Sequence, residues 1–137
     1  MANTLSYGTR GELWAAAAAI IPNTSASSAV LKVPPNASGR MIVTLNVTVS
    51  GGTIDLAYDS ISLRGYATDD ASDVGVPLTD DLSSLTAYNL LANSAGASSC
   101  NRGVSMLWFP VVKATITSDG TKTFTFSDAM CVISPTR

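Results

Sequence analysis

The sequence predicts an all-β fold, an antiparallel β-sandwich or jelly roll with at most one or two short helices. Apolar and polar residues alternate over residues 41–49 and again over residues 112–117, which is the pattern of a strand with one buried face. A turn that contains glycine follows each of these runs. The chain has 137 residues, enough for one hydrophobic core but too few for two, so we expect a single domain over residues 1–137.

The first predicted hairpin spans residues 41–58. Its first strand alternates between apolar and polar side chains, and a Ser-Gly-Gly turn follows at residues 50–52. A second run then begins, in which Ile54, Leu56 and Tyr58 share one face. A glycine turn between two alternating runs is a typical hairpin signal.

The second predicted hairpin spans residues 109–126. Apolar residues occupy alternate positions over residues 112–116, and an Asp-Gly pair at residues 119–120 separates them from another alternating run. Asp-Gly between such runs favours a hairpin. Residues 46–53 and 114–121 are locally alike, which either an internal duplication or the shared chemistry of hairpin turns explains.

Shorter strands are predicted where brief apolar segments lie between Pro, Gly, Asn or Asp, at residues 29–33, 60–66, 105–109 and 129–134. Residues 34–39 and 93–103 are rich in turn-forming and small polar residues, so we expect exposed loops there. Residues 79–90 favour a short helix, because Thr79 can cap it and two aspartates occupy its first turn.

Two segments are harder to assign. Residues 12–21 contain an alanine run, which suits a helix but also a strand packed closely against another sheet or subunit, so both alternatives stay open. Residues 1–28 are interpreted as an N-terminal arm or edge segment. Residues 67–103 are interpreted as a long insertion of loop and short helix.

The composition favours assembly with other proteins. Hydrophobic residues make up 46% and charged residues 13% of the chain, about half the usual charged share. The mean hydropathy is +0.27 without a long apolar run, so we expect neighbouring subunits to cover part of the surface in a homo-oligomer. The net charge is −2 and the basic residues are scattered, which argues against a nucleic-acid partner.

No enzymatic activity and no cofactor are predicted. Histidine is absent, which removes the commonest general base and metal ligand. The lysines at positions 32, 113 and 122 lie in or beside alternating strands, where exposure is the simplest expectation. Residues 14–21 are too short to span a bilayer, so no membrane role is expected. Cys100 and Cys131 are interpreted as free thiols, because Cys131 lies in an apolar run.

Two groups of candidate site residues remain. Asp69, Asp70 and Asp73 have the spacing of a metal motif, but no calcium-binding loop surrounds them, and a solvated polar loop is the favoured interpretation. The second group consists of large apolar side chains that suit a core or a protein interface, namely Trp14, Ile20, Ile21, Trp108 and Phe109. A sugar-binding platform built from aromatic residues is the alternative to an interface.

The two alternating runs also carry a resemblance. Residues 43–53 are Val-Thr-Leu-Asn-Val-Thr-Val-Ser-Gly-Gly-Thr, and residues 112–121 are Val-Lys-Ala-Thr-Ile-Thr-Ser-Asp-Gly-Thr. This pair is similar to the paired hairpins of small β-sandwich structural proteins of tailed bacteriophages, over about half the chain. The alanine run and residues 69–103 have no counterpart in that resemblance.

The resemblance implies a capsid decoration or head-associated subunit that assembles in the host cytoplasm and resides in the virion. The implied partners are copies of itself and a capsid or other virion protein. It assigns no functional residue. A carbohydrate-binding or adhesin-like sandwich is the alternative function, because aromatic, Asp and Asn side chains could bind sugars.

Overall fold

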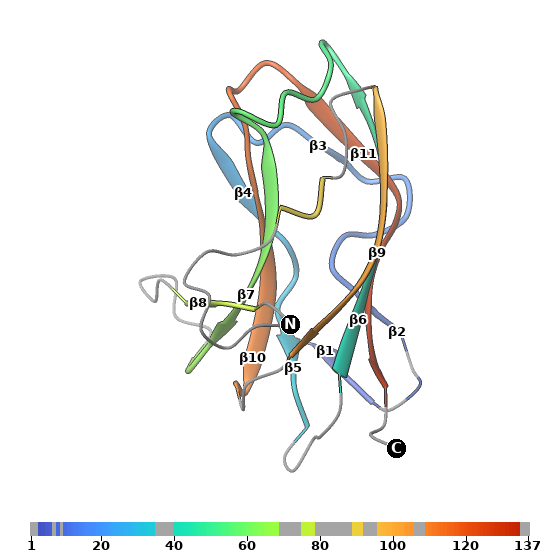
Figure 1. Ribbon diagram of the computed structural model, residues 1–137, viewed down its shortest axis with the longest axis vertical. Helices are drawn as coiled ribbons and strands as arrows, with labels where there is room; N and C mark the ends of the chain where they lie inside the picture. The colour runs from blue at the N-terminus through green and yellow to red at the C-terminus, as the bar shows by residue number, and fades with distance from the viewer. Residues whose placement is uncertain are drawn as a thin grey trace.

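The computed structural model describes residues 3–6, 8, 10–34, 40–68, 75–78, 89–91, 96–105 and 109–134. They form two β-sheets packed face to face (Figure 1), which confirms the predicted all-β sandwich. Every regular element within these ranges is a strand. The same ranges contain no helix long and apolar enough to cross a membrane.

The first sheet has the strand order β2-β11-β6-β9, and β3 pairs with β11 on the same side as β2. All of its pairings are antiparallel. A β-bulge between Phe126 and Asp128 interrupts the long pairing of β11 with β6. The strands of this sheet are β2 (Arg10–Glu12), β3 (Ala19–Ile20), β6 (Arg40–Ser50), β9 (Ala97–Ser105) and β11 (Thr123–Ser134).

The second sheet has the order β1-β5-β10-β7-β8, with β4 also paired to β10. Only β1 and β5 run parallel among its described pairs. The predicted strand at residues 60–66 is confirmed as β7. The strands of this sheet are β1 (Asn3–Thr4), β4 (Ser25–Ser27), β5 (Leu31–Lys32), β7 (Ser60–Tyr66), β8 (Val76–Pro77) and β10 (Val111–Thr117).

The predicted hairpin at residues 41–58 is wrong. Strand β6 forms as expected, but its chain then crosses to the other sheet and becomes β7, and residues 53–58 form no strand. Gly51 and Gly52 both have positive φ, 78° and 151°, and they turn the chain out of the first sheet. The alternation also fails after this turn, because Ile54 is buried while Tyr58 is exposed.

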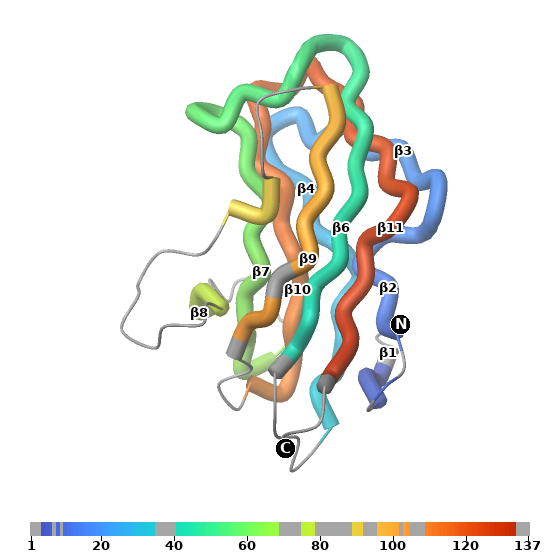
Figure 2. Tube along the Cα trace, turned by 45° about the vertical axis from the view of Figure 1, so that its right-hand side comes forward, coloured from blue at the N-terminus to red at the C-terminus, as the bar shows by residue number. Residues whose placement is uncertain are grey.

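The predicted hairpin at residues 109–126 is wrong for the same reason. Strand β10 pairs with β7 in one sheet, and β11 pairs with β6 in the other. The Asp-Gly turn therefore joins two sheets instead of two neighbouring strands. Both connections are β-arches, in which consecutive strands lie in opposite layers, and the two arches lie side by side (Figure 2).

The predicted loop at residues 93–103 is also corrected. Its second half belongs to β9, which pairs with β6 from Ala97 to Ser105. Small polar residues hide the strand pattern, although Ser98 and Val104 face the core and are buried. The interpretation of residues 67–103 as an insertion therefore fails at its C-terminal end. Most of the helix predicted at residues 79–90 lies outside the described residues, as does the middle of the strand predicted at residues 105–109.

The N-terminal segment lies along both sheets. Strands β2 and β3 flank β11, whereas β4 flanks β10. The alanine run is neither one helix nor one strand, because the chain bends after Glu12, turns at Ala17 with a φ of 66°, and pairs again only at Ala19 and Ile20. The turn lets one short segment supply two separate edge strands to the same sheet.

The core lies between the two sheets. Inward residues of β6, which the alternation predicted, pack there with those of β7, β10 and β11. Trp14 stacks on Phe126 with ring centroids 4.6 Å apart and an interplanar angle of 4°. The largest fully buried side chains are Phe124, Phe126, Leu5, Leu13, Leu31, Met41, Leu45, Ile54, Ile61, Leu63, Leu78 and Leu90.

Candidate functional site at the loop end of the sandwich

Three connections meet at one end of the sandwich, drawn at the top of Figure 1. They are residues 21–24, 51–59 and 118–122, and we call this region the loop end. The backbone N–H of Ser118 donates to the carbonyl of Thr24 at 3.1 Å. A side chain at Gly51 would meet the carbonyl oxygen of Thr121. Residues 118–122 therefore pack against both other connections, and a side chain at Gly51 would have no room.

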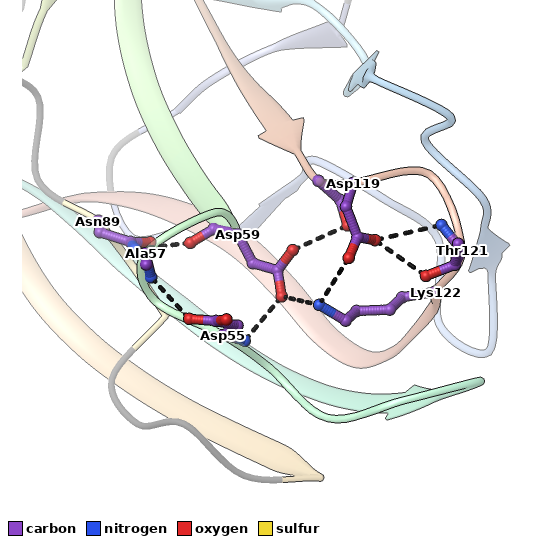
Figure 3. A network of polar contacts seen from close by, with 8 residues as sticks. Asp55, Ala57, Asp59, Asn89, Asp119, Thr121 and Lys122 are labelled. Atoms are coloured by element: carbon purple, nitrogen blue, oxygen red, sulfur yellow. Dashed lines mark hydrogen bonds and ion pairs between the residues drawn. The ribbon is translucent and has the colours of Figure 1, made fainter.

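An ion pair joins the two arches inside the loop end (Figure 3). The Lys122 Nζ atom lies 2.7 Å from Asp59 Oδ2, and the two side chains are 7% and 0% exposed. Asp59 Oδ2 also accepts the backbone N–H of Asp55 at 2.8 Å, and Asp59 Oδ1 accepts the Ser118 hydroxyl at 2.8 Å. Each carboxylate oxygen of Asp59 thus has a donor within the chain.

These contacts hold both groups in their charged forms. Burial alone would raise the pKa of Asp59, but hydrogen bonds from Asp55, Lys122 and Ser118, together with the Lys122 charge, lower it below its ordinary 3.8. The hydrogen bond to Asp59 raises the pKa of Lys122 above its ordinary 10.5, against the opposing effect of burial. A protonated amine is neither a nucleophile nor a base, so the geometry favours a structural role for this pair.

Shorter hydrogen bonds fix each arch locally. Asp119 Oδ1 accepts the backbone N–H of Thr121 at 3.2 Å and its hydroxyl at 2.9 Å, and these two bonds lower the pKa of Asp119. Asp55 Oδ1 accepts the N–H of Ala57 at 3.0 Å. Both are side-chain turns of the kind that Asp forms within its own loop, and they give the exposed parts of the arches a defined shape.

The start of β7 is anchored by one further side chain. Asn89 donates from Nδ2 to the carbonyl of Asp59 at 3.0 Å and accepts the N–H of Ile61 on Oδ1 at 3.1 Å. Leu90 also donates its N–H to the Ile61 carbonyl at 2.8 Å. Asp59 is therefore positioned through its backbone as well as its carboxylate.

Three large apolar side chains project from this rigid end. Ile21 is 60% exposed, Leu56 is 41% exposed and Tyr58 is 67% exposed. Among the described residues only Ile42 and Val76 are comparable in size and exposure. Apolar side chains on a preformed surface can bind a partner without a large ordering cost, so the loop end is suited to contact.

The predicted interface residues differ in how far the structure buries them. Ile21 is exposed at the loop end, and Ile20 is partly buried against the core. Trp14 is only 7% exposed and belongs to the core. Phe109 packs partly buried against the core, with its ring against Gly65. Trp108 lies outside the described residues.

The candidate metal ligands Asp69, Asp70 and Asp73 also lie outside the described residues. Within the described part of the chain, no three His, Cys, Asp or Glu side chains gather to hold a metal ion. Cys100 and Cys131 form no disulfide with each other, as was expected. Burial raises the pKa of Cys131 to about 12.

Sequence reasoning missed the loop end itself. Leu56 and Tyr58 were expected on a buried strand face, and Lys122 was expected to be exposed, but it is buried. The local signal for the first arch was Asp55, which begins a side-chain turn. No local signal could pair Asp59 with Lys122, because 63 positions separate them.

Comparisons with known proteins found no matching family model, no similar curated protein and no similar solved structure.

Proposed function

We propose that this chain is a viral structural protein, a phage capsid decoration or cement subunit that assembles with copies of itself and with a capsid protein. It would act in the virion after assembly in the host cytoplasm. Its low share of charged residues and its β-sandwich fold support this proposal. The resemblance to phage head proteins supports it only through the sequences of residues 43–53 and 112–121, because neither segment forms the hairpin on which that resemblance was drawn. No step of this function requires a catalytic group.

The observation that carries the proposal is the group of exposed apolar side chains on a rigid end. Leu56 and Tyr58 sit on the arch that the buried Asp59–Lys122 pair ties to the other arch, and Ile21 sits on the connection whose Thr24 carbonyl accepts the Ser118 N–H. Burying one such side chain contributes about 1.5–3 kcal/mol when burial is complete. A single contact would be weak, but repetition over many symmetric copies makes it strong.

The test is the mass of the protein in solution. Light scattering and sedimentation over a concentration series would compare the wild type with the triple variant Ile21→Ser, Leu56→Ser, Tyr58→Ser. A matched control is Val76→Ser, which removes an exposed apolar side chain from β8. We expect the wild type and the control to self-associate, and the triple variant to associate at least tenfold more weakly.

Salt identifies the kind of contact. Apolar association should persist at about 1 M salt, where charge interactions are screened within about 3 Å. A wild type that stays monomeric at every concentration and salt, or a triple variant that associates as the wild type does, would refute the proposal.

A second candidate function is carbohydrate binding. Tyr58 favours it, because its ring is 67% exposed beside a loop whose Asp55 side chain is also accessible. An exposed aromatic face can stack on a sugar ring. Glycan-array binding by the monomer that is lost in Tyr58→Ala would support this function, and an array without signal would eliminate it for the glycans tested.

A further inference from the structure

The outer face of the second sheet carries three cationic side chains at neighbouring cross-strand positions. Arg64 on β7 lies directly opposite Lys113 on β10, and Lys32 on β5 lies opposite Val111, two residues before Lys113. Opposite residues share a face, and diagonal neighbours are within reach of long side chains. Lys32, Arg64 and Lys113 therefore form what we call the basic row.

The basic row has no countercharge in the described part of the chain. The carboxylates described there belong to β2, β11 and the loop end, and both ion pairs among these residues use Lys122. Lys113 lies over the ring of Tyr66, with Nζ 4.6 Å from the ring centroid. Like charges placed directly opposite each other destabilise a strand pair, so an anionic group placed over the basic row would relieve the repulsion between Arg64 and Lys113.

The outer face of the first sheet carries the matching acids. Glu12 on β2 lies opposite Met130 on β11, and Asp128 is two residues before Met130 on the same strand. Glu12 and Asp128 are thus diagonal neighbours, as Lys32 and Lys113 are on the other face. We call them the acidic pair. Asp128 accepts a hydrogen bond from Asn46 at 3.4 Å, and neither ion pair within the described ranges includes it.

Apolar side chains adjoin the acidic pair. Ile42 is 37% exposed and lies opposite Val132, and Met130 is the next outward residue of β11. Arg10 shares this face and contacts the Met130 sulfur at 3.5 Å. The face therefore combines apolar side chains with two carboxylates and the Arg10 guanidinium, and in a protein contact the apolar part suits the centre and the charged groups suit the rim.

We propose that a second copy of this chain docks the basic row of one subunit against the acidic pair of the next. The contact is heterologous, because it joins different faces, and it repeats along an open array. The inference rests on the proposed function, in which copies of the chain assemble, and it adds a second contact that is independent of the loop end. Charge complementarity between the two faces selects a second copy as the occupant.

The test uses two charge-reversed variants. One carries Arg64→Glu and Lys113→Glu, and the other carries Glu12→Lys and Asp128→Lys. We expect each variant alone to self-associate at least tenfold more weakly than the wild type at low salt. An equal mixture should recover association, because each face of one variant then meets an opposite charge on the other.

The mixture is also the control for folding and net charge. Two variants that recover association on mixing are both folded, and circular dichroism of each would verify this directly. Single variants that each associate as strongly as the wild type, or variants that fold but do not recover association on mixing, would overturn the inference.

The outcome is distinguishable from failure of the proposed function. Wild-type protein that is monomeric at all salt concentrations overturns both. Wild-type protein whose association depends on the loop end, resists high salt and ignores the charge reversals overturns only the charged contact. Association that weakens as salt is added, falls in each charge-reversed variant and returns when the two variants are mixed supports the charged contact.

Discussion

Replacing Lys122 with Met should destabilise the fold by about 3 kcal/mol. The ion pair has a 2.7 Å separation, with side chains 7% and 0% exposed. Removing one partner of a buried pair costs about 3–5 kcal/mol, because a charge stays buried without its countercharge. Asp59 would keep its hydrogen bonds from Asp55 and Ser118, which places the expected cost at the low end of that range.

Thermal unfolding followed by circular dichroism measures this effect. For a domain of this size, about 3 kcal/mol corresponds to a fall in Tm of about 12 °C. Lys32→Met is the matched control, because it removes a lysine that is exposed on β5, and it should change Tm by less than about 2 °C. Adding Asp59→Asn to Lys122→Met should recover part of the loss, since no buried charge then remains.

The pH dependence gives an independent check. In the wild type the folded-state pKa of Asp59 lies below 3.8, so its contribution is complete above that pH and is lost as pH falls through the folded value. The raised pKa of Lys122 makes its contribution complete below 10.5 and lost only as pH rises through the higher folded value. Without Lys122, the pKa of Asp59 is higher than in the wild type, because the hydrogen bond and the positive charge of Lys122 no longer lower it.

The difference in Tm between Lys122→Met and the wild type should therefore shrink as pH is lowered through the folded-state pKa that Asp59 has in the variant. A variant within 2 °C of the wild type at pH 7, or a difference that grows as pH is lowered, would refute the assignment of a buried, charged pair.

Two further predictions concern the arches and the thiols. Gly51→Ala should lower the unfolding free energy by about 2 kcal/mol or more, because the φ of 78° is unfavourable and the new Cβ would lie 2.8 Å from a backbone oxygen. Gly8→Ala shares the positive φ but meets no atom, so chemical denaturation should show a loss of only about 1 kcal/mol; equal losses would contradict the clash. Cys131 should resist alkylation at pH 8 in the native protein and react only on unfolding, since its pKa is about 12 and its side chain is buried. Mass spectrometry that finds Cys131 modified as fast as in the denatured chain would contradict this placement.

The alternation of apolar and polar residues along the sequence was enough to predict the class of fold and several individual strands. The alternation from Met41 to Val49 identified the strand and its buried face, because side chains on a strand point to opposite sides in turn. The same reasoning recovered β7 at its observed bounds. It missed β9, since a strand of Ser, Asn and Gly at the edge of a sheet has little apolar contrast to detect.

The candidate site was only partly accessible to the same reasoning. Ile21 was identified as an interface residue and is exposed, whereas Trp14 was identified for the same reason and lies in the core. Size and hydropathy cannot separate these outcomes, because a large apolar residue suits both a core and an interface. The acidic pair and the basic row depend on register, and strands far apart in sequence set that register.

By itself, the sequence determined that the chain forms strands, which strand faces are apolar, and that no histidine chemistry is possible. The tertiary structure alone decided that each glycine turn joins two sheets, because a turn fixes where a chain bends but not which layer receives the next strand. That choice depends on how Phe126 and the other inward side chains fill a shared core, and on the pairing of Asp59 with Lys122 across two arches. Both are long-range contacts, and they place the exposed apolar residues at one end of the molecule.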